Sequence, residues 1–202
     1  LQYHEVKINL EFRTLAECCG VDSTSNIPSG VSLTGASLYV DYIYLDTDER
    51  RRFAQVSHEY LIEQLQHTGS ESITANTTNV NVDLNFNHPV KCLNWTIQDT
   101  TYSTVGSLTD GTARRADGNQ KLRYSCLAPR NNKYDTFESG KIQLNGHDRM
   151  SERDSDYYRL VQNVQHMEVA PTKTIYTYSF GLKPAEHQPS GTCNFSRIDN
   201  AK

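Results

Sequence analysis

Short segments of alternating polarity, few helical segments and long polar connections predict an all-β fold, an antiparallel β-sandwich or jelly roll with few short helices. The composition agrees with this class. Hydrophobic residues make up only 36% of the 202 residues, and twelve tyrosines stand beside a single tryptophan. A chain of this kind, with prominent Thr, Ser and Asn, suits thin β-layers better than a thick helical core.

The predicted strands place apolar residues at every second position, which puts them on one face of a sheet. Residues 37–45, SLYVDYIYL, are the strongest candidate because they are aromatic and β-branched throughout. In residues 90–98, Leu93, Trp95 and Ile97 share a face, so we expect the tryptophan to be largely buried in the core. The other expected strands are 5–13, 80–87, 121–126, 141–145 and 173–181.

Turn and helix signals are few. Asn145-Gly146 follows a short strand and is a good signal for a tight turn. Only two helices are expected, one that starts near Asp48 and one over residues 155–164, SDYYRLVQNV. Long polar connections, above all 68–79 and 98–120, separate the strands.

The stretch DTDERRRF holds three consecutive arginines, which raises the possibility of a nucleic-acid-binding helix. Residues 46–52 contain three acids and three arginines and therefore sum to zero charge. Acids at the start of a helix followed by bases complement its dipole, whereas nucleic-acid binding needs a clustered basic face. The chain also has a net charge of −4 and a pI near 6.0. The interpretation is a scaffold, with no direct contact to nucleic acid.

Motifs for catalysis and metal binding fail on residue identity. The calcium-loop resemblance of DTDERRRF lacks the required glycine, and His58-Glu59 is followed at position 62 by Ile rather than a second histidine. No nucleophile elbow, phosphate-binding loop or dinucleotide turn occurs. We expect no enzyme, no cofactor and no metal site.

Cysteines and sequons complete the survey. Five cysteines at irregular spacing argue against a disulfide framework and for reduced thiols. Without a visible secretory signal, the N-x-S/T sequons at Asn76, Asn94 and Asn194 are expected to be chance occurrences rather than glycosylation sites. No apolar run approaches the roughly 20 residues of a membrane span, so we expect no membrane anchor.

Three long blocks carry a resemblance that pattern alone does not supply. SLYVDYIYLDTDERRRFAQVSHEYLIEQLQ (37–66), LNFNHPVKCLNW (84–95) and GLKPAEHQPSGTCNFSRIDNA (181–201) stand in the same order, together with LQYHEVKINLEF at the start, as in a known family. The chain resembles the major capsid proteins of nucleocytoplasmic large DNA viruses, of the algal-virus and giant-virus type.

This resemblance implies two successive jelly rolls and a homotrimer that forms a pseudo-hexagonal capsomer of an icosahedral shell. Residues 1–50 would be the last strands of the first jelly roll, and residues 51–202 most of the second, with further strands expected on both sides. Implied partners are further copies of the chain, neighbouring capsomers and minor capsid proteins. The implied location is the virion, after assembly in the host cytoplasm.

The resemblance also changes the interpretation of residues 46–66. Propensity favours a continuous helix over 48–66, but the resemblance implies a short helix or turn at 47–55 and a strand over about 59–66, and we expect the latter. The inter-barrel or assembly residues would then be Asp48, Glu49, Arg50, Arg51 and Arg52. A carbohydrate-binding, lectin-like jelly roll is the alternative function, because lectin domains share the architecture.

Overall fold

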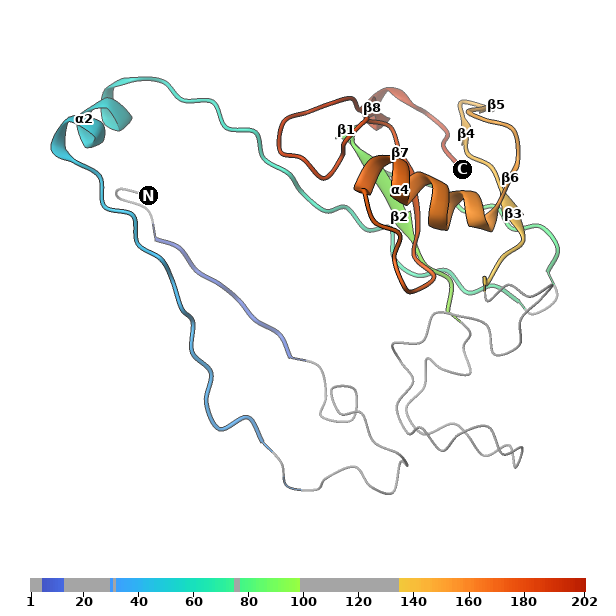
Figure 1. The fold of residues 1–202 in the computed structure, drawn as a ribbon, viewed down its shortest axis with the longest axis horizontal. Coiled ribbons are helices and arrows are strands. Elements are labelled where there is room, and N and C mark those ends of the chain that lie inside the picture. Colours follow the sequence, from blue (N-terminus) through green and yellow to red (C-terminus); the bar gives the residue numbers. More distant parts are fainter. Residues whose placement is uncertain (1–4, 13–29, 31, 75–76, 99–134) are drawn as a thin grey trace. The chain divides into compact units, whose positions relative to one another are not determined.

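The computed structural model describes residues 5–12, 30, 32–74, 77–98 and 135–202 (Figure 1). Residues 29–67 form one compact unit, and residues 1–28 with 68–202 form the other. The elements, in order, are α2 (Thr47–Gln55), β1 (Pro89–Val90), β2 (Cys92–Trp95), β3 (Ser139–Gly140), β4 (Gln143–Leu144), β5 (His147–Asp148), β6 (Arg153–Asp154), η2 (Tyr157–Val161), α4 (Gln162–Met167), β7 (Tyr176–Ser179), β8 (Cys193–Asn194) and η3 (Phe195–Arg197).

In the unit that contains residues 68–202, the central ladder is the antiparallel pair β2 and β7. Leu93 lies opposite Tyr178 in this pair, and Trp95 lies opposite Tyr176. One more backbone hydrogen bond extends it, from the N–H of Phe180 to the carbonyl of Lys91 at 2.9 Å. The expected strands over 90–98 and 173–181 are therefore present in shortened form. All four residues of β7 are buried, so this strand is covered on both faces.

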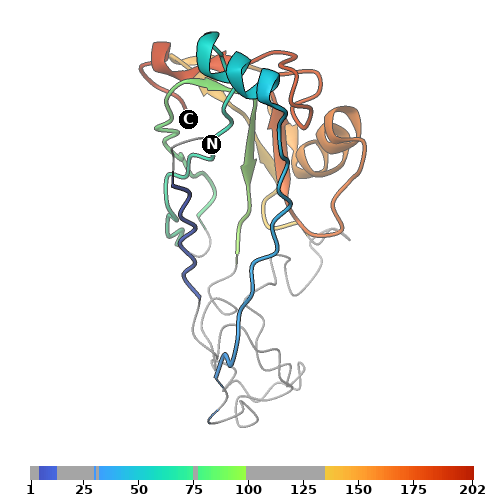
Figure 2. The same cartoon turned by 90° about the vertical axis from the view of Figure 1, so that its left-hand side faces the viewer.

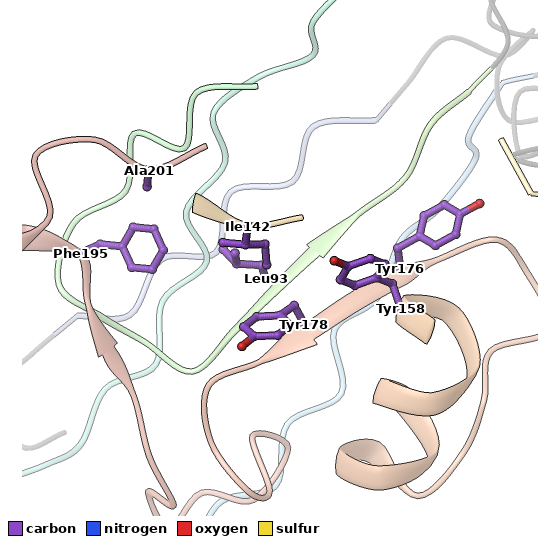
Figure 3. Packing of buried hydrophobic residues seen from close by; sticks show 7 residues of the cluster. All are labelled: Leu93, Ile142, Tyr158, Tyr176, Tyr178, Phe195 and Ala201. Carbon is purple, nitrogen blue, oxygen red and sulfur yellow. The ribbon is translucent and has the colours of Figure 1, made fainter. Parts of the chain in front are cut away.

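Aromatic and aliphatic side chains from segments far apart in the sequence form the core (Figure 3). The rings of Phe137 and Tyr176 pack edge to face with their centroids 4.6 Å apart, and the rings of Trp95 and Tyr158 do so with centroids 5.2 Å apart. Such edge-to-face pairs add to the hydrophobic burial of each ring. The fully buried members of the core are Leu93, Ile142, Tyr158, Tyr176, Tyr178, Phe195 and Ala201.

Trp95 is partly buried and packs against the core, which confirms in part the expectation that it would be largely buried. It is the last residue of β2, and its ring lies in contact with Phe137, Tyr158 and Tyr176. Leu93, two residues earlier on the same face, is 8% exposed and takes the central position instead. The predicted alternation was right, but the end of the strand leaves part of the indole ring open.

A helix formed by η2 and α4 covers the edge of β7 that faces away from β2. Because Phe180 and Tyr178 turn their N–H groups toward β2, Ser179 turns its N–H outward, where the Oε1 of Gln162 accepts it at 3.0 Å. Asn163 stabilises the wide turn of η2 by donating to the carbonyls of Tyr158 and Arg159. This confirms the helix expected over 155–164.

The Asn145-Gly146 turn is also confirmed, and it supplies the partner strand that the sequence left open. Residues 145 and 146 have φ of 52° and 79°, the paired positive values of a two-residue hairpin turn, and they connect β4 to β5. Two further antiparallel pairs join β3 to β6 and β1 to β8.

Four expected strands are not strands in the described chain: 5–12 (the described part of 5–13), 37–45, 59–66 and 80–87. These predictions were wrong for the structure as it stands. Their apolar side chains alternate, but a β-strand also needs a neighbouring backbone to receive its hydrogen bonds. Figures 1 and 2 draw the segments on both sides of α2 as extended chain without strand arrows. The strand expected over 121–126 lies outside the described residues.

Candidate functional site

The five sequence-predicted site residues all lie on α2. Asp46 caps this helix by accepting from the N–H of Thr47, Asp48 and Glu49 occupy its first turn, and Arg52 its last. This order of charges follows the helix dipole, and the helix ends at Gln55 as expected from the resemblance rather than continuing to 66.

The charges of α2 are almost entirely in solvent. Arg51 Nη1 lies 3.3 Å from Asp48 Oδ1, with side chains that are 62% and 86% exposed. An ion pair this open contributes about 0.2–1 kcal/mol. No residue of α2 is buried, and the structure brings the five predicted site residues together on this one helix.

The segments that flank α2 form the most unusual surface of the molecule. Every described residue from 32 to 67, here called the uncovered segment, is exposed. Tyr39 is 94% and Leu65 95% exposed. Ring contacts within the segment are local, such as Phe53 on His58 at 5.0 Å and His58 on Tyr60 at 6.1 Å. Exposed apolar area on this scale marks an interaction surface.

His58 belongs to this stacked group, which places it between two aromatic rings rather than in an acid–base site. Among the described residues, no three His, Cys, Asp or Glu side chains lie close enough to hold a metal ion. None of the helices in the described ranges combines the length and apolarity that crossing a membrane requires.

A buried polar cluster was missed by sequence reasoning. Arg159 forms a two-pronged pair with Asp135, Nε to Oδ1 at 2.8 Å and Nη2 to Oδ2 at 3.0 Å, and donates also to Asp156. The hydroxyl of Tyr176 donates to Asp135 at 3.0 Å. The hydrogen bond with Asp135 raises the pKa of the Arg159 guanidinium. Nothing in the local sequence indicates the cluster. Asp156 and Arg159 are three positions apart, but all other pairs of its members are separated by 17 to 41 positions.

This cluster has a structural role rather than a catalytic one. Asp135 is 5% exposed and connects the chain entering β3 to both the helix and β7. Burial raises the pKa of Tyr176 to about 12, so its hydroxyl keeps its proton well above pH 10. The arrangement fixes the helix on the sheet edge.

The described sequons are occupied by structural hydrogen bonds. The Oδ1 of Asn94 accepts from Thr177 across the central ladder, and the Oδ1 of Asn194 accepts from the N–H of Ser196 at the start of η3. Ser196 in turn accepts from the N–H of His88, which has a φ of 66°. Asn76 lies outside the described residues.

Cys92 and Cys193 are thiols that form no disulfide, and burial raises the pKa of Cys193. The other three cysteines lie outside the described residues.

The fold and surface define an antiparallel β-protein with few short helices and a long exposed segment that carries many apolar side chains. Comparison with known proteins gives the family. Residues 49–202 match the family model described as large eukaryotic DNA virus major capsid protein, and residues 1–46 match that of the major capsid protein N-terminus. The chain belongs to the major capsid protein family of large eukaryotic DNA viruses. This is a family of structural capsid proteins and not a class of enzymes.

Individual relatives agree. The chain is 48% identical to the major capsid protein of Pyramimonas orientalis virus and 43% identical to that of Paramecium bursaria Chlorella virus 1, over its full length in both cases. It covers 47% and 48% of these proteins, so it spans about half the length of the curated relatives that it matches.

Among solved structures, the quasi-atomic model of the PBCV-1 virus capsid matches 79% of the chain and 41% of that structure's chain, with a TM-score of 0.62 and 43% identity.

Proposed function

We propose that the chain is part of a major capsid protein that self-assembles into trimeric pseudo-hexagonal capsomers of an icosahedral virus shell. The observation that carries this proposal is the family match over residues 49–202, together with 48% identity over the whole chain to a viral major capsid protein. The similarity to a chain of the solved PBCV-1 virus capsid also supports it.

The uncovered segment gives the proposal a physical basis. A capsid protein acts through extended, relatively apolar interfaces that become buried only on assembly. Residues 32–67 present aromatic and aliphatic side chains of this kind without any cover in the described chain. We therefore assign this segment to contacts that the complete, assembled protein makes.

We further propose two incomplete jelly rolls, residues 1–50 as the last strands of the first and 51–202 as most of the second. The two family models meet between residues 46 and 49, close to the expected boundary, which supports this division. Helix α2 begins at Thr47 and would connect the two barrels.

On this division, Asp48, Glu49, Arg50, Arg51 and Arg52 lie where the barrels join. None of them is buried, so they can form ion pairs between barrels or subunits. Neighbouring capsomers and minor capsid proteins are the further partners in this proposal, and the virion, assembled in the host cytoplasm, is the location. The protein works through shape and association, without catalysis and without direct contact to nucleic acid.

The direct test is the mass of the protein made from the complete reading frame, measured by size-exclusion chromatography with light scattering. We expect a stable trimer with closed three-fold symmetry. A protein that stays monomeric at high concentration would contradict the capsid proposal.

A further inference from the structure

The last three residues of the chain already have the hydrogen bonding of an interior strand. On one side, Gln143 and Lys202 exchange both backbone hydrogen bonds, at 2.9 and 3.0 Å, and the N–H of Asn145 donates to Asn200. On the other side, the N–H of Leu84 donates to the carbonyl of Ala201 at 2.9 Å. An edge strand has partners on one side only, so this segment sits between two others.

Both neighbours run antiparallel to the C-terminal segment. The bridge between Leu144 and Ala201 is antiparallel. On the opposite side, Lys202 Nζ lies 3.8 Å from Asp83 while Ala201 bonds to Leu84, so the two chains run in opposite directions there as well. The direction in which the polypeptide would continue past Lys202 is therefore fixed on both sides.

If the strand continued past Lys202, one of its two neighbours would be the edge of residues 139–143 that faces away from β5 and β6. Gly140 pairs with Arg153, and the carbonyl of Ile142 accepts from Arg149, so these two residues face the β5–β6 side. Backbone groups alternate along a strand, so Ser139 and Lys141 turn theirs the other way, the way Gln143 faces Lys202. The side chain of Lys141 donates from its Nζ to Asp148 Oδ2 at 3.0 Å.

The neighbour on the other side would be the segment of residues 80–84. Val82 and Val80 alternate with Leu84 and are 37% and 44% exposed, whereas Leu84 packs against the core. This is the stretch that the sequence predicted as part of a strand and that forms none in the described chain.

We propose that the residues following Lys202 in the complete polypeptide form an interior β-strand between residues 80–84 and 139–143, antiparallel to both. Counting on from the observed pairs, the first residue after Lys202 lies opposite Val82, the second opposite Lys141 and the fourth opposite Ser139. The inference rests on the proposed function only in requiring a longer polypeptide, as in relatives of which this chain covers 47% and 48%.

The register also predicts the pattern of the sequence that follows. Ala201 is buried and Lys202 is exposed, so the first and third residues after Lys202 turn their side chains to the core. We expect these two positions to be apolar in the complete reading frame. A reading frame that stops at Lys202, or one with charged residues at both positions, would overturn the proposal.

Amide hydrogen exchange provides the structural test, on the protein made from the complete reading frame and on the 202-residue chain as a reference. The amides of Val82, Ser139 and Lys141 should exchange on the order of 100-fold more slowly in the longer protein. A trimer in which these amides exchange equally fast would overturn this inference but not the capsid function. Slow exchange of these amides in a protein that stays monomeric would support this inference and contradict the capsid function.

Two substitutions of Lys141 in the same complete protein test by thermal melting whether a strand pairs with residues 139–143. Lys141→Pro removes the N–H that the new strand would use, whereas Lys141→Ala removes only the side chain and its ion pair with Asp148. We expect the proline variant to melt at least roughly 3 °C below the alanine variant. Equal melting temperatures would contradict a strand at this edge.

Discussion

At the scale of single residues, the pair of Asp135 and Arg159 is the most buried ion pair found among the described residues. The side chain of Asp135 is 2% exposed and that of Arg159 is 24% exposed, so Arg159 is the cation that pairs with an almost fully buried carboxylate. A buried ion pair adds little stability over an apolar pair, but the loss of one partner leaves a charge without compensation.

We therefore expect Arg159→Leu to lower the free energy of unfolding by about 3 kcal/mol, as measured by urea denaturation. Lys183→Leu is the matched control, because Lys183 pairs with Glu186 through side chains that are more than half exposed. The control should lose less than about 1 kcal/mol. Equal losses in the two variants would mean that Asp135 does not need Arg159.

Two core tyrosines predict how stability depends on pH. Burial raises the pKa of Tyr158 and of Tyr176 from 10 to about 12. Because the folded pKa is the higher one, folding favours the neutral phenol. Its contribution is complete below pH 10 and is lost as the pH rises from about 10 to 12.

The expected result is a steep fall in unfolding free energy between pH 10 and 12, with a smaller slope in Tyr158→Phe, which cannot ionise at that position. Denaturation at a series of pH values measures both. Tyr39, which is 94% exposed, provides the control: Tyr39→Phe should keep the wild-type slope. A Tyr158→Phe slope equal to that of wild type would contradict the assignment.

At the scale of elements, the helix of η2 and α4 acts as a cover for the open edge of β7. Gln162 is 4% exposed and uses its carbonyl oxygen to bond the N–H of Ser179, while its Nε2 donates to the hydroxyl of Tyr157. A buried N–H that loses its acceptor costs roughly 1–3 kcal/mol.

Gln162→Ala should therefore destabilise the protein by about 2 kcal/mol and accelerate amide exchange at Ser179. Gln165 lies on the same helix with its side chain exposed, so Gln165→Ala should change stability by no more than about 0.5 kcal/mol. Unchanged exchange at Ser179 in the Gln162 variant would show that another group satisfies this N–H.

Apart from the strands of the central ladder, the elements that the sequence predicted correctly are those whose signals are local. The Asn145-Gly146 turn needs only positive φ at two neighbouring positions, and the charges of α2 need only the dipole of their own helix. The predicted strands at 37–45 and 59–66 depend on distant backbone, and the described chain contains no ladder for them.

At the scale of the whole molecule, the charges of α2 are expected to act in assembly. Arg51→Glu with Arg52→Glu in the complete protein should weaken the trimer several-fold, because the reversed charges would repel their acidic partners across the interface. Light scattering across a dilution series measures the change.

Lys183→Glu with Arg197→Glu alters the net charge by the same amount at exposed positions that do not belong to α2, and this control should leave the trimer intact. Equal weakening by both double variants would assign the effect to net charge rather than to α2.

The sequence by itself determined the β-rich class, the short helices near 47 and 155, the hairpin turn and, through three long blocks of resemblance, the capsid family. Each of these depends on residues that are neighbours in the chain or on an ordered series of words in it. Only the tertiary structure decided that Leu93 rather than Trp95 takes the centre of the core, that Gln162 closes the edge of β7, and that Asp135 meets Arg159. The physical reason is that burial and hydrogen-bond partners depend on which backbone lies alongside, and in an antiparallel β-protein that backbone comes from far along the chain.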